Sequence, residues 1–410
     1  MPSPTSGRAW HFTPQMMIRF TTAGESHGKG LVAILEGVPA GLALGVDDVD
    51  RDLARRMAGY GRGARMKIER DCVEFLAGVR EGETLGSPIG MFIANLDWEN
   101  WQDVMAPEPD GPDAGARRRK VVRPRPGHVD LAGSLKYARS DARDVLERAS
   151  ARETAARVAC GAVCRTLLAQ FGVEIGSHVV ALGAVRAPQV ETWPTPLNAA
   201  ADASPVRCLD AATSDAMVAA VDAAESARDT LGGVAEIVAR GVALGLGSHV
   251  SWDRKLDGRI ARAVMSIPAV KGVEIGLGFA AAALPGSRVH DEIGRGGASS
   301  RTGGIQRRSN RAGGLEAGIT NGEPIVVRAA MKPIATLRQP LETVSLETGE
   351  PVRAQSERSD VTAVPAMGVI AEAMVALVLA DAMCEKFGGD SLGEMRRNFE
   401  GYLAQLSARW

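Results

Sequence analysis

The feature that most constrains this chain is a long apolar segment near the C-terminus, VTAVPAMGVIAEAMVALVLADAM, which begins at Val361. A segment that is apolar on every face is buried, either in a protein core or in a membrane. Glu372 and Asp381 interrupt it, and its longest uncharged run, residues 361–371, is far shorter than the roughly 18 residues that a membrane span needs. We therefore predict a buried helix over 361–387 that ends at the glycines of FGG.

The rest of the chain alternates between strand-like and helix-like stretches. The patterns predict strands within 30–44, a β-hairpin over 71–95, and further strands near 173–185, 234–244 and 323–330. Helices are predicted from residue 46 to the glycines near 59–63, over 141–170 and over 254–266. Such mixed order indicates a protein built from both helices and sheets.

Composition excludes several classes of protein. The chain has 410 residues, of which 45% are hydrophobic, and a formal net charge of −1, which argues against a general nucleic-acid-binding surface. Aromatic residues make up only 4%, so platforms for stacking bases are not expected. The five cysteines show no C-x-x-C spacing, and the N-terminus has no apolar stretch typical of a secretion signal, so we expect a cytoplasmic protein.

We expect one large domain. Residues 1–16 are interpreted as a disordered extension, with Met17 as an alternative start, and residues 17–400 as the catalytic domain. Within it, residues 106–120 are interpreted as a surface insertion and residues 286–313 as a long, mobile active-site loop. Residues 401–410 are expected to form a C-terminal tail.

Two of the six histidines lie in polar loops bracketed by glycine or proline: His27 in GESHG and His128 in RPRPGHVD. Histidine exchanges protons near neutral pH, so both are candidates for acid–base chemistry, although a single histidine is more often structural. His178 and His249, each within GSHV, are interpreted as structural. No H-E-x-x-H, H-x-H or Cys/His cluster occurs, so the sequence predicts no metal site.

The GESHG stretch also matches the G-x-S-x-G pattern of hydrolases, with Ser26 as the nucleophile. That pattern needs a strand–turn–helix context, whereas KGLVAILEG after it has the pattern of a second strand. The hydrolase hypothesis is therefore weak but stays open. A non-catalytic protein that binds anions or RNA through its basic loops is another alternative.

Arginines recur beside small residues, serines and histidines: Arg55, Arg56, Arg62, Arg65, Arg123, Arg125, Arg148, Arg152 and Arg358. Each alone is best explained as a solvated or ion-paired side chain, but together they indicate a site for a small polyanion. Lys332 and Thr336 in MKPIATL could add a phosphate-binding turn. Asp360 opens the buried helix, where an N-cap role is favoured locally over a functional one.

Several stretches together resemble the chorismate synthase family over residues 17–399: GESHGKGLVAILEGVPAG, RPGHVD, ERASARETAARVACG, SNRAGG, MKPIATL and ERSDVTAVPAMGVIAEAMVALVLA. The resemblance implies an α+β fold in which a helical layer is sandwiched between two antiparallel four-stranded sheets. It implies a lyase that converts 5-enolpyruvylshikimate 3-phosphate to chorismate and phosphate by anti 1,4-elimination. It also implies a homotetramer and a requirement for reduced FMN, which gives an electron transiently and takes it back, with no net redox change.

The resemblance carries roles onto residues of this chain. His27 would protonate the leaving phosphate, His128 would stabilise the reduced flavin, and Asp360 would accept the substrate's proton by way of the flavin. The implied substrate-binding residues are Ser26, Arg56, Arg62, Arg125, Arg152 and Arg358. The implied FMN-binding residues are Arg148, Ala149, Ser150, Pro268, Ala269, Ala317, Lys332, Pro333, Ile334, Ala335, Thr336 and Arg358.

Two positions depart from the family pattern. Ala317 replaces a glycine that is common in the family, and Pro268 replaces a polar residue. If position 317 needs a positive φ, alanine is strained there. The chain also lacks a G-x-G-x-x-G that opens a helix after a strand, so we expect an external NADPH-dependent system to reduce the FMN.

Overall fold

The structure, a computed structural model, describes residues 17–63, 70–108, 119–296, 301–356 and 360–409. The N-terminal extension expected over 1–16 lies outside this part of the chain, as do residues 109–118 of the expected insertion. The expected loop 286–313 is described except for 297–300, and it contains the short hairpin of β11 (Ile293–Arg295) and β12 (Ile305–Arg307).

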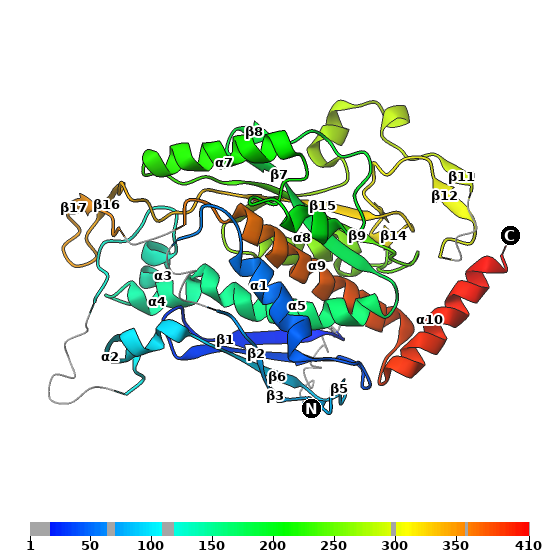
Figure 1. Cartoon of the computed structure of the whole chain (residues 1–410), viewed down its shortest axis with the longest axis horizontal. Coiled ribbons are helices and arrows are strands. Elements are labelled where there is room, and N and C mark those ends of the chain that lie inside the picture. The colour runs from blue at the N-terminus through cyan, green and yellow to red at the C-terminus, as the bar shows by residue number, and fades with distance from the viewer. Residues whose placement is uncertain (1–16, 64–69, 109–118, 297–300, 357–359, 410) are drawn as a thin grey trace, which may run out of the picture.

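Two antiparallel sheets dominate the molecule (Figure 1). The first has the order β1-β2-β6-β3, with bounds β1 Arg19–Ala23, β2 Gly30–Glu36, β6 Ile89–Ala94 and β3 Glu74–Ala77. The second has the order β10-β15-β9-β7-β8, with bounds β10 Val270–Ile275, β15 Ile325–Met331, β9 Gly233–Arg240, β7 Glu174–Leu182 and β8 Val185–Arg186. It therefore has five strands rather than the four expected, because the two-residue β8 pairs with the end of β7.

Smaller elements surround the two sheets. Three further two-stranded ladders are β4–β5 (Val79–Arg80, Glu83–Thr84), β13–β14 (Leu315–Glu316, Ile319–Thr320) and β16–β17 (Glu342–Val344, Pro351–Arg353). The helices are α1 Val46–Met57, α2 Gln102–Met105, α3 Asp130–Lys136, α4 Arg143–Ala149, α5 Thr154–Ala169, α6 Leu197–Asp202, α7 Ala211–Ser226, α8 Leu256–Met265, α9 Val364–Phe387 and α10 Leu392–Ser407. Residues 401–407, expected as a tail, thus belong to α10.

The core is centred on the crossing of α5 and α9. In Figure 1 these helices run through the middle of the molecule; α5 packs on β2 of the first sheet and α9 on β7 and β9 of the second. The crossing is close enough that a Cβ on Gly161 would lie 2.3 Å from the Cβ of Ala373, so only glycine fits there. The 24-residue α9 is long and apolar enough to cross a membrane by composition, but it is buried inside the protein as the core helix.

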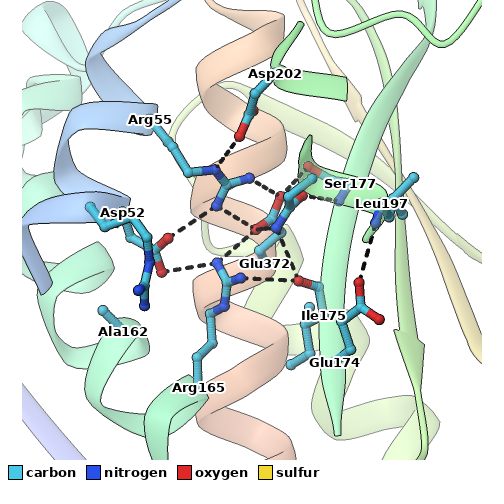
Figure 2. Close-up of polar contacts among 12 residues, drawn as sticks. Asp52, Arg55, Ala162, Arg165, Glu174, Ile175, Ser177, Leu197, Asp202 and Glu372 are labelled. Carbon is cyan, nitrogen blue, oxygen red and sulfur yellow. Dashed lines mark hydrogen bonds and ion pairs between the residues drawn. The ribbon is translucent and has the colours of Figure 1, made fainter. Parts of the chain in front are cut away.

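Both charges that interrupt the apolar segment are paired. Glu372 is fully buried on α9, and its two carboxylate oxygens accept hydrogen bonds from Arg55 and Arg165 at 2.9 Å (Figure 2). Ser177, Asn198 and Arg207 also donate to this carboxylate, at 2.6–3.2 Å. Burial opposes ionisation of Glu372, but the arginines outweigh it and lower its pKa to about 2.

Asp381 lies further along α9 and ties the segment just before β1 to the core. Its carboxylate accepts a hydrogen bond from the Ile18 backbone N–H at 2.8 Å and contacts Arg259. The two acidic residues therefore join α9 to α1, α5, α8 and the residue that precedes β1. A buried carboxylate is tolerated when it is paired and hydrogen-bonded in this way.

Two predicted helix boundaries were wrong. The segment 141–170 is not one helix: α4 ends at Ala149, Ser150 is extended with φ −62° and ψ 146°, and a 3-10 turn over Ala151–Glu153 leads into α5. The core helix begins at Val364 rather than at 361, and its N-cap is Ala363. Asp360 is therefore not the N-cap, which removes the local structural explanation that the sequence favoured for it.

Replacing Glu372 by alanine should destabilise the protein strongly. We expect Glu372→Ala to lower the free energy of unfolding by about 3–5 kcal/mol, because the substitution removes the fully buried carboxylate that Arg55, Arg165 and Arg207 share. Urea unfolding followed by circular dichroism would measure this loss.

Glu385→Ala is the matched control, because Glu385 lies on the same helix and pairs with Arg254 and Arg259, but its side chain is 36% exposed. Its loss should cost no more than about 1 kcal/mol. Equal effects of the two substitutions would show that burial of the Glu372 network adds nothing.

Candidate active site

The loop between β1 and β2 carries Ser26 and His27. It turns sharply at Gly24, which has φ 110° and where a Cβ would lie 2.4 Å from the Gly30 carbonyl oxygen. The loop leads from one strand directly into another, as the sequence predicted, so Ser26 does not precede a helix. This geometry differs from the strand–turn–helix of a hydrolase nucleophile and argues against that alternative.

His27 is held on two sides. Its Nδ1 lies 2.9 Å from Glu147, and its backbone N–H donates to the same carboxylate at 3.0 Å. The ring stacks on Trp101 with centroids 3.8 Å apart. Glu147 is buried and also accepts from Arg143 at 2.8 Å. Burial opposes its ionisation, but hydrogen bonds from His27 outweigh this and lower the pKa of Glu147.

The break at Ser150 directs two arginines to different places. Arg148, at the end of α4, donates to the backbone carbonyls of Thr22 and Gly24 at 2.9 and 3.2 Å, and so holds the loop that carries His27. Arg152, after the break, is buried and donates to Asn95 at 2.8 Å. On the single helix predicted over 141–170, Arg148 and Arg152 would lie four residues apart on one face, and the break separates them.

Arg56 and Arg152 share one buried carboxylate. Asp71 Oδ2 lies 3.2 Å from Arg56, and Asp71 Oδ1 contacts Arg152. Arg56 also donates to Thr154 at 3.0 Å. Burial lowers the pKa of Arg56 to about 10; Asp71 opposes this shift, and repulsion from Arg62 and Arg152 adds to it. Three cations are thus close enough to repel one another, as expected of a site for anions.

Asp360 faces this arginine cluster. It pairs with Arg62 at 3.1 Å and accepts a hydrogen bond from the Gly63 backbone N–H at 2.6 Å. The two segments also run alongside each other, since the Val361 N–H donates to the Gly61 carbonyl at 2.8 Å. Asp360 is one of the charges that acts on Arg56, which places it within the same electrostatic cluster.

Asn95 connects the arginine cluster to the His27 loop. Its side-chain oxygen accepts from Arg152, and its amide group donates to the carbonyls of Gly28 at 2.6 Å and Glu25 at 3.1 Å. A single side chain, Asn95, therefore contacts both the turn that contains His27 and the guanidinium group of Arg152. Ser26, His27, Arg56, Arg62, Arg152 and Asp360 thus form one connected region.

His128 and Arg125 are linked through Asp130. Arg125 Nε donates to Asp130 at 2.8 Å, and His128 Nδ1 contacts the other oxygen. Burial opposes ionisation of Asp130, but hydrogen bonds from His128 and Arg125 outweigh it and hold the pKa well below its usual range. Arg125 also donates to Thr336 at 2.9 Å, which joins this group to the turn after β15.

The turn 332–336 contains five of the twelve implied cofactor residues, and Pro268 and Ala269 lie against it. Lys332 Nζ donates to the Gly127 carbonyl, and its backbone N–H donates to the Ala269 carbonyl, both at 2.9 Å. Ala269 has φ 67° and follows Pro268, so a strained turn lies against the lysine. Burial lowers the pKa of Lys332, and repulsion from Lys271 adds to this shift. Pro333, Ile334 and Ala335 complete the turn.

A path of backbone contacts joins this turn to Asp360. Thr230 donates its hydroxyl to the Ile334 carbonyl at 2.8 Å, and the next residue, Leu231, donates its N–H to the Val361 carbonyl at 2.9 Å. Asp360 directly precedes Val361. The lysine turn and the arginine cluster are therefore held by neighbouring residues of one segment.

One implied residue lies away from this region, and another falls outside the described residues. Ala317 lies in the β13–β14 turn next to the start of α8, since Gly318 accepts from the Leu256 N–H at 2.9 Å. Ala269 follows the other end of α8, and ten helical residues span about 15 Å. Arg358 lies outside the described residues. Ala149 and Ser150 lie at the α4–α5 break, where Ser150 accepts from the Arg152 N–H at 3.3 Å.

Known proteins are similar to this chain over almost its whole length. A family model described as chorismate synthase matches residues 18–384. The chorismate synthase of Streptomyces coelicolor is 58% identical over 397 residues, which cover 96% of this chain and 99% of that protein. A relative of the same name from Moorella thermoacetica is 58% identical over 390 residues, with coverages of 95% and 99%. A crystal structure of chorismate synthase, 44% identical, covers 95% of this chain and 98% of its own with a TM-score of 0.76.

The chain belongs to the chorismate synthase family. Membership confirms the resemblance drawn from the sequence and makes the chain an enzyme of the chorismate-forming step of the shikimate pathway. The solved relative also supports a mixed α/β fold with antiparallel sheets.

Several residues of this candidate site were not predicted from the sequence. They hold the predicted residues in place, and all except the partly exposed Trp101 are buried: Asp71, Asn95, Trp101, Asp130, Arg143, Glu147 and Thr154. Two of them carried a usable signal, since Asp130 follows His128 by two residues and Glu147 precedes Arg148 within a quoted stretch. Asp71 and Asn95 carried none, because their partners are distant in the sequence.

The family departure at position 317 has a measurable structural consequence. Ala317 adopts φ 51°, the left-handed conformation that the more usual glycine adopts without strain. Pro268 precedes another alanine with positive φ, so both departures lie at strained turns.

Restoring the glycine at position 317 should stabilise the protein. The left-handed conformation costs an L-residue roughly 1–2 kcal/mol, and glycine costs about 0.4–1 kcal/mol in unfolded-chain entropy. We therefore expect Ala317→Gly to raise the free energy of unfolding by about 0.5–1 kcal/mol.

Chemical denaturation of both proteins under one set of conditions would measure the difference. Ala223→Gly in the exposed face of α7 is the control, and should destabilise by about 1 kcal/mol. A loss of stability in both variants would contradict the strain at position 317.

Proposed function

We propose that this chain eliminates phosphate from 5-enolpyruvylshikimate 3-phosphate to form chorismate, by an anti 1,4-elimination that requires reduced FMN. The observation that carries the proposal is the buried pair Arg56 and Arg152 on one carboxylate, Asp71, next to Arg62 and Asp360. A substrate with one phosphate and two carboxylates needs several guanidinium groups, because each forms paired hydrogen bonds to an anion.

Burial strengthens these groups as anion receptors. Arg56 and Arg152 are 4% and 5% exposed, so a bound anion would interact with them in a medium of lower dielectric than water. Repulsion among Arg56, Arg62 and Arg152 would fall when an anion enters. Donors that are already in place act on charge that develops on the leaving phosphate without reorganising.

The residues near Lys332 fit a phosphorylated, anionic cofactor. Lys332 and Lys271 repel each other, and Lys332 is partly removed from water, so an anion between them would relieve both costs. The residues that would hold FMN are Arg148, Ala149, Ser150, Pro268, Ala269, Lys332, Pro333, Ile334, Ala335, Thr336 and Arg358. Bound reduced FMN would supply an electron transiently, which a protein side chain cannot do.

The acid–base residues take the roles that the family resemblance implies, and their contacts are compatible with those roles. His27 would give its proton to the oxygen of the leaving phosphate, and Asp360 would receive the ring proton of the substrate. His128, in contact with Asp130, would lie by the reduced flavin and stabilise its charge. Arg125, on the same carboxylate, would contact the substrate from that side.

The remaining implications of the family belong to the same proposal. They are a homotetramer, a cytoplasmic location and an external NADPH-dependent system that reduces FMN. Ala317 lies at the far end of α8 from Ala269. It would therefore contact the cofactor only where more than one copy of the chain in the homotetramer contributes to the site.

Turnover should depend on reduced flavin. Under anaerobic conditions, the protein with chemically reduced FMN should release phosphate and form chorismate in equal amounts, measured by phosphate assay and chorismate absorbance. With oxidised FMN and no reductant, neither product should form. Equal rates with oxidised and reduced FMN would refute the cofactor requirement.

His27→Ala and Asp360→Ala should each lower kcat by 100-fold or more, about the contribution of one general acid or base. Binding of FMN, measured by fluorescence titration, should change little in either variant. His249→Ala, in an exposed turn, is the control and should retain full turnover. Unchanged turnover in both test variants would rule out the assigned roles.

A further inference from the structure

The last turn of α4 holds the His27 loop by five separate contacts. The Glu147 carboxylate accepts from the His27 backbone N–H and lies against Nδ1, and the Glu147 backbone carbonyl accepts from the Ser26 N–H at 3.0 Å. The adjacent Arg148 donates to the carbonyls of Thr22 and Gly24. One helix turn therefore fixes both the backbone of the loop and the orientation of its imidazole.

The charge on Glu147 is maintained although the side chain is 2% exposed. Arg143, four residues earlier on the same helix, donates to Oε1 at 2.8 Å, and hydrogen bonds from His27 lower the pKa of Glu147 despite its burial. An ionised carboxylate only accepts hydrogen bonds. The Nδ1 atom that faces it must therefore carry a hydrogen.

Trp101 fixes the remaining freedom of the ring. It stacks on His27 with an interplanar angle of 24°, and its other contacts include the guanidinium groups of Arg119 and Arg143, at 4.5 and 5.2 Å from the indole ring. Rotation of the imidazole would break both the stacking and the contact with Glu147. The orientation and the tautomer are thus determined together.

We propose that Glu147 is a positioning residue for acid catalysis by His27: it holds the hydrogen on Nδ1, so that the proton transferred to a substrate is the one on Nε2. This inference rests on the proposed function for its kinetic consequence, but not for the tautomer. In the transfer, the Nε2–H bond of the imidazolium breaks and an O–H bond forms on the leaving phosphate. The neutral imidazole that results keeps its hydrogen on Nδ1, which is the form that Glu147 stabilises, and Nε2 regains a proton from solvent.

The tautomer can be measured without any turnover. In protein labelled with 15N on the rings of its six histidines, two-dimensional NMR distinguishes Nδ1–H from Nε2–H imidazole, and loss of a signal in His27→Gln assigns His27. Neutral His27 should be the Nδ1–H form in the wild type. It should change to the Nε2–H form in Glu147→Ala and remain Nδ1–H in Glu147→Gln, whose amide oxygen still accepts a hydrogen bond.

Kinetic measurements test whether the tautomer of His27 affects turnover. Glu147→Ala should lower kcat about 10–100-fold, as is typical when a partner that orients a histidine is lost, with KM changed less than about twofold because a group that acts only in the transition state is lost. Glu147→Gln should fall between Glu147→Ala and the wild type. The matched control is Glu153→Ala, which also removes a carboxylate paired with an arginine four residues away on a helix, and it should change neither tautomer nor kcat.

The outcomes separate the two proposals. A wild-type or Glu147→Ala spectrum that contradicts the expected tautomer overturns the role of Glu147, and so does a changed tautomer with unchanged kcat while the wild type makes chorismate. Absence of chorismate formation in the wild type would instead overturn the proposed function and leave the tautomer result standing. If Glu147→Ala fails to fold, Glu147→Asp decides: its carboxylate is withdrawn by one methylene, and an unaltered tautomer and kcat would refute the proposal.

Discussion

The pairing of buried guanidinium groups with buried carboxylates is the constraint on which this structure depends. Arginines stay charged even when they are buried, so each must find a counter-charge in the protein or in a ligand. In the helical core the counter-charges are Glu372, Asp52 and Asp202, which are shared by the arginines of that network. Near the candidate site they are the buried Asp71 and the half-buried Asp360, whose arginines would also meet an anionic substrate. The same kind of ion pair therefore stabilises the helical core and positions the arginines of the candidate site.

The two networks are joined at the end of α1. Arg55 reaches the buried Glu372, and the next residue, Arg56, reaches Asp71. Successive residues of a helix point in directions about 100° apart, so one turn of α1 serves the core on one side and the site on the other. The position of Arg56 is thereby tied to the most deeply buried ion pairs of the core. A helix with neighbouring arginines held this way has little freedom to rotate.

Much of the fold and part of the candidate site could be predicted from the sequence, because the relevant patterns are local. The apolar run around Glu372 predicted the core helix, and the second strand after GESHG argued against a hydrolase, as the structure bears out. The break at Ser150 could not be predicted, since the apolar spacing continues through it and only the contacts of Arg148 and Arg152 determine that the chain turns. The N-cap interpretation of Asp360 was wrong for a similar reason. An aspartate before a helix is usually a cap, but Asp360 pairs with Arg62, which is almost 300 residues away.

The carboxylates also set a limit on how tightly the site can hold anions. Arginines without counter-charges would bind a phosphorylated dicarboxylate strongly, but they would bind free phosphate strongly as well. Asp71 competes with any anion for Arg56 and Arg152, and Asp360 competes for Arg62. A ligand that engages several arginines at once can outweigh this competition, whereas a small anion that engages only one or two cannot. Asp71 and Asp360 would thus favour retention of the substrate over retention of the phosphate that leaves. A site crowded with positive charge would then still release its product.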